Sequence, residues 1–170
     1  MKEVEQFYNR LLKINYGWHD KSGNLHTKID TKIFANEFKM QQYNKVEESG
    51  HAICWEMCEL ERHFFDEHRI ENHTIMAVIK KENGGCPCHT FITIILDGQL
   101  YWFEASWIGQ KGIRKFKDIN ELKNFIRYNF QDFAKKSYDP DAIEFIEYGN
   151  PTDCTDFYSF FENALKGTKI

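Results

Sequence analysis

Residues 89–106 read HTFITIILDGQLYWFEAS and carry the strongest strand pattern of the chain. β-Branched and aromatic residues on both sides of Asp97-Gly98 predict two strands, over residues 89–96 and 99–106. An Asp-Gly pair between two such runs is a favoured two-residue hairpin turn. The strands are therefore expected to pair antiparallel, and the numbers of opposed residues then sum to 195, as 97 and 98 do.

This register places two ionisable residues on one face of the predicted sheet. His89 faces Ser106, and Glu104 stands two positions before Ser106 on the same strand. Residues two apart in a strand share a face, so His89 and Glu104 are diagonal neighbours, roughly 7–8 Å apart at Cα. A Glu side chain can span that distance to an imidazole. A three-residue loop would instead put Glu104 on the opposite face.

The clearest helix is predicted over residues 53–67. Its apolar stripe has helical spacing and consists of Ile53, Met57, Leu60 and Phe64. Ser49-Gly50 supplies the break before it. Because the apolar face is wide, we expect a central, buried helix that packs against the sheet.

Cys54 opens this helix and completes a candidate catalytic site with His89 and Glu104. A thiol at a helix N-terminus loses its proton more easily, and a neighbouring imidazole stabilises the thiolate. A carboxylate can hold that imidazole in the useful tautomer. The three residue types are therefore those that nucleophilic thiol chemistry requires.

The remaining pattern predicts an α+β fold. Further helices are expected over residues 2–14, 31–43, 118–130 and 156–165, and further strands over 74–79 and 142–148, with a loop over 16–25 and a turn over 82–85. Helices come first and mostly antiparallel strands follow, so an antiparallel sheet should pack against the central Cys54 helix, with extra helices around it. The 170 residues contain 42% hydrophobic residues and no repeat or linker, which favours a single domain over residues 1–170.

Composition excludes several classes of function. The net charge is -4 without a basic block, so nucleic acid is not an expected partner. No apolar run approaches the ~20 residues of a membrane span, and the charged N-terminus does not resemble a signal peptide. If Met1 is the native start, a cytoplasmic location is expected. The five cysteines are an odd number, and reduced thiols are the default there.

Three segments, residues 50–56, 89–91 and 101–107, together resemble the transglutaminase-like branch of the papain-fold cysteine enzymes. The resemblance implies that Cys54 attacks an amide or ester carbonyl and forms a thioester, that His89 shuttles the proton and that Glu104 orients His89. The backbone N–H of Cys54 would help bind the oxyanion, and Trp18 is a candidate second donor because transglutaminases use an upstream Trp. Neither a metal nor an organic cofactor is implied.

The resemblance leaves the substrate open. A protein, a peptide or a small amide fits, and so do peptidase, amidase, deamidase and transglutaminase activities. Glu104 stands where the branch commonly has Asp, and Ile53 precedes the thiol where a polar or small residue is frequent. An arylamine acetyltransferase-like enzyme uses the same triad logic, but its usual Arg-Gly-Gly before the thiol is replaced by residues 48–51, Glu-Ser-Gly-His.

Three further hypotheses involve no acyl transfer. A catalytically inactive binding module could use the aromatic residues 101–103 and Trp107 as a ligand groove. A zinc site is a second possibility, with the ligand types Cys54, Cys58, Cys88 and His89, although their spacing matches no common zinc motif. A redox switch would involve Cys86 or Cys88. His51 is close enough in sequence to tune the thiol.

Overall fold

The computed structural model describes residues 1–79, 87–134, 138–151 and 153–170, and these form an α+β fold. Its main sheet has the strand order β10-β9-β5-β6-β7-β8, and every pairing in it is antiparallel. The strands are β5 Glu71–Val78, β6 Cys88–Leu96, β7 Gln99–Glu104, β8 Gly112–Phe116, β9 Glu144–Glu147 and β10 Thr168–Lys169. The long strands β5 and β6 lie at its centre.

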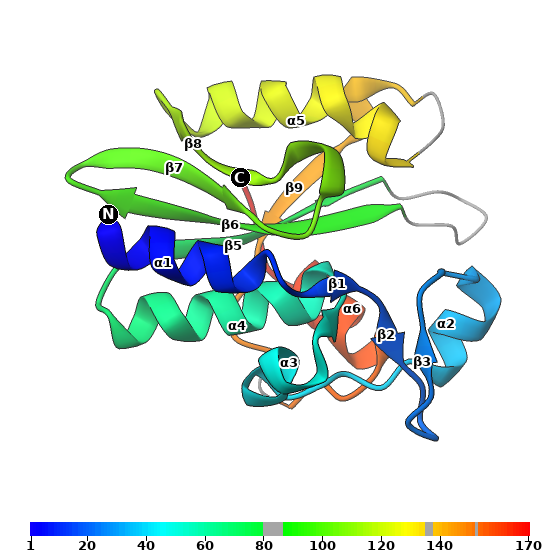
Figure 1. The fold of residues 1–170 in the computed structure, drawn as a ribbon. Helices are drawn as coiled ribbons and strands as arrows, with labels where there is room; N and C mark the ends of the chain where they lie inside the picture. The colour runs from blue at the N-terminus through cyan, green and yellow to red at the C-terminus, as the bar shows by residue number, and fades with distance from the viewer. Residues whose placement is uncertain (80–86, 135–137, 152) are drawn as a thin grey trace.

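Helices cover both faces of this sheet (Figure 1). Six α-helices lie in the described residues: α1 Lys2–Leu11, α2 Thr31–Glu37, α3 Tyr43–Ser49, α4 Cys54–Glu67, α5 Ile119–Ala134 and α6 Phe157–Leu165. α1 and α4 lie side by side on one face, and α5 covers the other. α6 packs beside α4, where the rings of Trp55 and Phe160 stack at 4.2 Å between centroids. None of the described helices combines the length and the apolar character that a bilayer crossing requires.

Two short strand pairs complete the fold next to the start of α4. β1 Asn15–Tyr16 runs parallel to β4 His51–Ala52, and β2 Trp18–His19 pairs antiparallel with β3 Leu25–His26. Tyr16 is opposite Ala52, so the chain segment after α1 runs directly beside the residues that precede Cys54.

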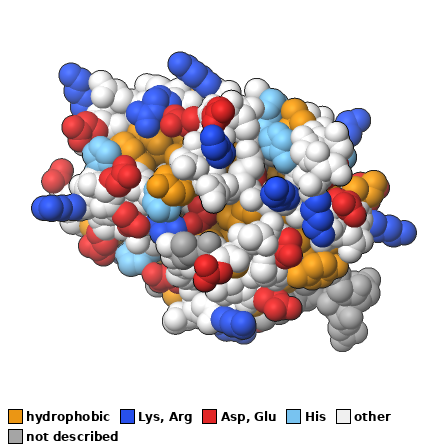
Figure 2. All heavy atoms as spheres, turned by 90° about the horizontal axis from the view of Figure 1, so that it is seen from below, with side chains coloured by type: hydrophobic (Ala, Val, Ile, Leu, Met, Phe, Trp, Pro, Cys, Tyr) orange, Lys and Arg blue, Asp and Glu red, His pale blue; other side chains and the backbone are white. Residues whose placement is uncertain are grey.

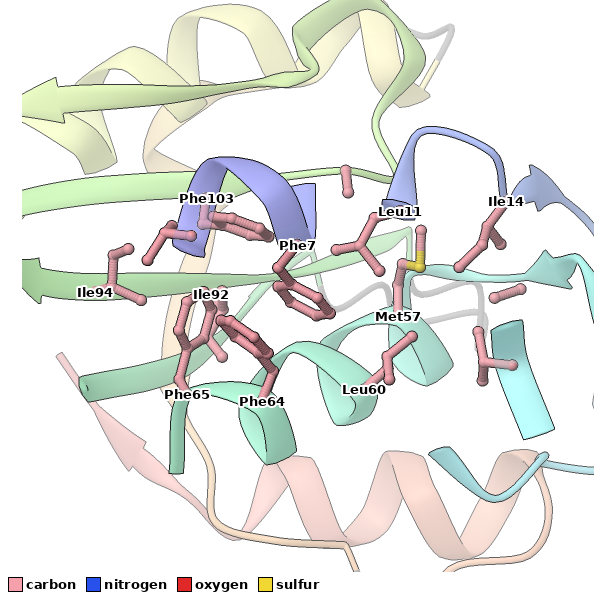
Figure 3. Packing of buried hydrophobic residues seen from close by; sticks show 14 residues of the cluster. Phe7, Leu11, Ile14, Met57, Leu60, Phe64, Phe65, Ile92, Ile94 and Phe103 are labelled. Atoms are coloured by element: carbon pink, nitrogen blue, oxygen red, sulfur yellow. The ribbon is translucent and has the colours of Figure 1, made fainter. Parts of the chain in front are cut away.

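The core between α1, α4 and the sheet is built from aromatic and aliphatic side chains (Figure 3). Phe7 of α1 stacks on Phe64 of α4 with 3.8 Å between ring centroids, and Phe7 also stacks on Phe103 of β7 at 6.0 Å. Burial of each such side chain contributes about 1.5–3 kcal/mol. This packing fixes α4, and with it Cys54, against the sheet.

The hairpin register predicted from Asp97-Gly98 is confirmed. β6 and β7 pair from Leu96 opposite Gln99 to Ile92 opposite Phe103. Asp97 and Gly98 have φ values of 51° and 71°, which is the left-handed conformation that a two-residue turn of this type needs at both positions.

Several other boundaries differ from the prediction. The helix expected over residues 31–43 ends as α2 at Glu37, because Phe38 is fully buried in extended backbone and pairs with Asp20, and the helix α3 over Tyr43–Ser49 was not predicted. The helix expected over residues 2–14 ends at Leu11, and strands β8 and β10 were not predicted. The turn expected over residues 82–85 lies outside the described residues.

Charged residues of both signs are mixed over the face on the side away from α5 (Figure 2). This distribution agrees with the small net charge of -4.

Candidate active site

Cys54, His89 and Glu104 come together at one end of the sheet. Cys54 is the first residue of α4, His89 the second residue of β6 and Glu104 the last residue of β7. β6 and β7 are neighbours in the sheet, and α4 packs against β5 and β6. All three side chains are deeply buried: 6% of Cys54 and 1% each of His89 and Glu104 are exposed.

The pair predicted from the hairpin register forms a direct contact. His89 Nε2 lies 2.7 Å from Glu104 Oε2. A hydrogen bond of this length between two buried ionisable groups is charge-assisted and geometrically specific. It fixes the plane of the imidazole.

Cys54 interacts with the same ring. Cys54 is close enough to the ring to raise the pKa of His89, and since Glu104 occupies Nε2, Nδ1 is the ring nitrogen that remains for the sulfur. Burial lowers the pKa of His89, but the negative charge of Glu104, the interaction with Cys54 and the hydrogen bond that the ring donates to Glu104 outweigh it and raise the pKa to about 10. The imidazole therefore carries a proton at neutral pH.

The second oxygen of Glu104 anchors the carboxylate. Oε1 accepts hydrogen bonds from the backbone N–H groups of Ser106 and Trp107, both at 2.7 Å, and from Ser106 Oγ at 3.0 Å. Burial raises the pKa of Glu104, whereas the His89 charge and these hydrogen bonds lower it, and the net direction is downward. Glu104 is therefore an ionised, immobilised acceptor for His89.

Glu56 fixes the first turn of α4. Its carboxylate accepts the N–H of Ile53 at 3.2 Å and the N–H of Gln41 at 2.8 Å. Glu56 is fully buried, and burial raises its pKa to about 7 although both hydrogen bonds oppose the shift. Gly50, with φ of 67°, allows the sharp reversal between α3 and α4.

Tyr16 is a member of the site that the sequence prediction missed. It is close enough to Cys54 and Cys88 for electrostatic interaction, and it packs against the same core cluster as Cys54. Burial, followed by the negative charges of Cys54, Cys88 and Glu56, raises the pKa of Tyr16. Its hydroxyl therefore stays protonated and able to donate. The only sequence signal was its position in Tyr16-Gly17-Trp18.

Trp18, the oxyanion donor suggested by the resemblance, has a different environment. Its indole Nε1 donates to the backbone oxygen of Lys28 at 3.1 Å. The ring is buried, stacks on His26 and contacts Phe34 edge-on. Because its donor is already used, this placement argues against an oxyanion role for Trp18.

A second buried carboxyl group lies near the three residues. Glu61 is on α4 two turns after Cys54 and is 2% exposed. Burial and the charge of Glu104 raise its pKa well above the usual value, and His89 opposes this effect. Burial therefore favours the neutral form of Glu61, whereas Glu104 is charged.

A small cavity of about 130 Å³ adjoins the site. Its wall includes Tyr16, which approaches Cys54, and Ser106, which binds Glu104. Cys54, His89 and Glu104 themselves do not line this cavity.

The zinc hypothesis lacks a ligand cluster in the part of the chain that the structure describes, where no three or more His, Cys, Asp or Glu residues are arranged to hold a metal ion. Cys58 instead donates from Sγ to Thr90 Oγ1 at 3.5 Å, and burial raises its pKa. Cys54 and Cys58 are free thiols. Cys86, proposed for a redox switch, lies outside the described residues.

The binding-module hypothesis is at odds with the geometry. Trp102, Phe103 and Trp107 are buried core residues and do not form the open groove that such a module would need. From its position in the sequence, His51 is a candidate for tuning the thiol. Its ring nitrogen Nδ1 lies 3.1 Å from the backbone oxygen of Ser49.

The site therefore consists of a sulfur at a helix start, a protonated imidazole and an anchored carboxylate, in that order. Tyr16 adds a hydroxyl donor beside the sulfur. In comparisons with known proteins, no family model, no curated protein and no solved structure matched this chain.

Proposed function

We propose that the protein is a cysteine-dependent acyl-transfer enzyme that cleaves an amide or ester through a thioester intermediate. The observation that carries the proposal is the position of His89, which hydrogen-bonds to Glu104 and is close enough to Cys54 for the two groups to affect each other's charge. A papain-like core, with a Cys-bearing helix packed on an antiparallel sheet, belongs to the same proposal and agrees with the resemblance noted above.

The first half-reaction uses the residues on either side of the sulfur. The Cys54 thiolate, stabilised by the protonated His89, attacks the substrate carbonyl carbon and forms a C–S bond. The backbone N–H of Cys54 and the hydroxyl of Tyr16 donate to the oxygen that becomes negative. His89 then gives its proton to the leaving amine or alcohol, the bond to that group breaks, and a thioester remains on Cys54.

The second half-reaction returns the enzyme to its starting state. His89, now neutral and held by Glu104, removes a proton from water or from an acceptor amine. The acceptor attacks the thioester carbonyl and the C–S bond breaks, which regenerates the thiolate and the imidazolium. Water as acceptor gives hydrolysis, and an amine gives transamidation.

Alkylation by iodoacetamide tests the proposal directly. At pH 7, we expect Cys54 to be carboxamidomethylated at least tenfold faster than Cys154, a half-buried thiol remote from His89. The rate at each cysteine is read by peptide mass spectrometry. In a His89→Ala variant the advantage of Cys54 should disappear while Cys154 reacts as before.

Equal rates at the two cysteines, or a fast reaction at Cys54 that survives His89→Ala, would contradict the proposal. Either result would favour a protein in which Cys54, His89 and Glu104 lie together but catalyse no acyl transfer. Circular dichroism of the variant shows whether it is folded.

A further inference from the structure

We propose that a second, larger cavity, between α3, α4 and residues 154–155 before α6, binds a small organic cation whose N–H groups donate to the buried carboxylate of Glu59. The ligand class is an amine or amidine with an apolar body. The cavity volume of about 770 Å³ lies within the range of small-molecule sites, about 300–1,000 Å³. Cys54, His89 and Glu104 do not line this cavity, so the site is separate from the candidate active site.

Glu59 supplies an acceptor that lacks a donor. Among the charged side chains that line the cavity it is the buried one, with 6% of its surface exposed. Its Oε2 accepts a hydrogen bond from Arg62 Nη2, but its Oε1 has no hydrogen-bond partner among the residues that the structure describes. A buried acceptor without a donor is costly, so a ligand that brings the missing N–H group gains binding free energy.

The positive charge beside Glu59 is shared with other groups. Arg62 Nη1 also lies 3.5 Å from Asp66 Oδ2, and Arg62 Nη2 donates to Asn150 Oδ1 at 2.8 Å. Two carboxylates thus face one guanidinium. Burial raises the pKa of Glu59 although Arg62 opposes this shift, so the carboxylate has too little positive charge around it. A cationic donor therefore suits Oε1 better than a neutral one.

The other charges on the cavity wall are exposed or already paired. The carboxylate of Asp20 is occupied by hydrogen bonds within its own loop. Lys45 Nζ donates to Glu48 at 2.8 Å. The side chain of Lys39 is exposed, so water and salt screen its ammonium group. Glu59 is therefore the charge that a ligand inside the cavity meets.

An aromatic stack forms another part of the wall. The rings of Tyr43 and His63 stack with 3.5 Å between centroids and 15° between planes. Burial and the charge of Arg62 lower the pKa of His63, so the imidazole is neutral at neutral pH and does not repel a cation. The face of an aromatic ring attracts a cation, and Met40 and Pro151 add apolar surface for the body of the ligand.

Cys154 reports on the same space. It lines the cavity as a half-buried free thiol. Burial and the charges of Asp153 and Glu59 raise its pKa, so its sulfur lies within electrostatic reach of the Glu59 carboxylate. A ligand bound at Glu59 should therefore cover this thiol.

Protection of Cys154 from iodoacetamide tests the inference. Benzylammonium, benzyl alcohol and benzoate share one ring and differ in charge, and they are compared at pH 7 and equal ionic strength. We expect benzylammonium to slow alkylation of Cys154 several-fold and to leave the rate at Cys54 unchanged. Benzyl alcohol should need about a tenfold higher concentration for half-protection, and benzoate should not protect. Isothermal titration calorimetry measures the Kd of each probe independently.

Two variants form a matched pair. Glu59→Gln and Glu67→Gln each remove one carboxylate from α4, but Glu67 is exposed and does not line the cavity. The Kd of benzylammonium should rise about tenfold or more in Glu59→Gln, because a charged hydrogen bond is lost, and should stay at the wild-type value in Glu67→Gln. Tyr43→Leu should weaken benzylammonium more than n-butylammonium, which keeps the inference testable if Glu59→Gln does not fold.

Several outcomes would overturn the inference. If benzyl alcohol binds as tightly as benzylammonium, or if Glu59→Gln keeps the wild-type Kd, the site does not recognise a cation through Glu59. If none of the probes binds at millimolar concentration, water alone fills the cavity. None of these results bears on the acyl-transfer proposal, which depends on the effect of His89 on Cys54 labelling, so the two proposals can fail separately.

Discussion

Glu104 shows how one side chain can perform two tasks. Oε2 orients His89, and Oε1 is held by three donors from Ser106 and Trp107. The carboxylate therefore needs no mobile partner to stay in place. An aspartate, one methylene shorter, could not make both sets of contacts from the same backbone position, which explains why Glu suits this register.

Glu104→Gln should disable the site without unfolding the protein. The three donors will retain the amide oxygen, so the amide NH₂ must face His89 Nε2 and force the ring into the wrong tautomer. We expect Cys54 alkylation by an optimal reagent to slow by about 10³- to 10⁴-fold. The pKa of His89, about 10 in the wild type, should fall because the charge of Glu104 is gone.

If Cys54 alkylation in Glu104→Gln is less than tenfold slower than in the wild type, the carboxylate does not orient His89. The near-ultraviolet circular dichroism spectrum, with Trp102 and Trp107 as reporters, checks that the core is intact.

At the scale of elements, the β6–β7 turn sets the register on which the site depends. Gly98 has φ of 71°, and open space surrounds the position where a Cβ would lie. Gly98→Ala should therefore cost about 1 kcal/mol through backbone strain alone. Gly109, which also has open space but no positive φ, is the matched control, and Gly109→Ala should be neutral or slightly stabilising.

Urea denaturation of both variants gives the two free energies of unfolding. If Gly98→Ala and Gly109→Ala have the same stability, the left-handed conformation of the turn carries no energetic cost for alanine.

Elements differed in how far the sequence could predict them. The β6–β7 register follows from two adjacent turn residues, so the His89–Glu104 pair was predictable from local rules. The contact with Cys54 depends on how α1 and α4 pack on the sheet, which no local pattern determines. The place of Tyr16 near Cys54 depends on the parallel β1–β4 pairing, and the early end of α2 at Glu37 depends on burial of Phe38; both are tertiary effects.

At the scale of the whole molecule, buried carboxyl groups govern how stability depends on pH. Glu56, Glu59 and Glu61 of α4 all have pKa values raised by burial. A carboxyl group whose pKa is raised in the folded state stabilises the fold fully below its unfolded pKa, near 4.5, and loses that contribution as the pH rises through the folded value. The three groups together should make the protein less stable above mildly acidic pH.

Glu61→Gln should flatten this dependence. The introduced amide cannot ionise beside Glu104, so the free energy of unfolding of the variant should fall less than that of the wild type between about pH 5 and about pH 8. Urea denaturation at several pH values measures both slopes. Glu67→Gln, an exposed substitution at the end of α4, should keep the wild-type slope; identical slopes for all three proteins would show that burial does not raise the pKa of Glu61.

His89 and Glu104 belong to paired strands, and Cys54 belongs to a helix that packs on α1 through the Phe7–Phe64 stack. Their alignment is thus achieved when the chain folds, before any ligand arrives. Heating should therefore abolish the special reactivity of the thiol and melt the interior in one cooperative event, with a single midpoint.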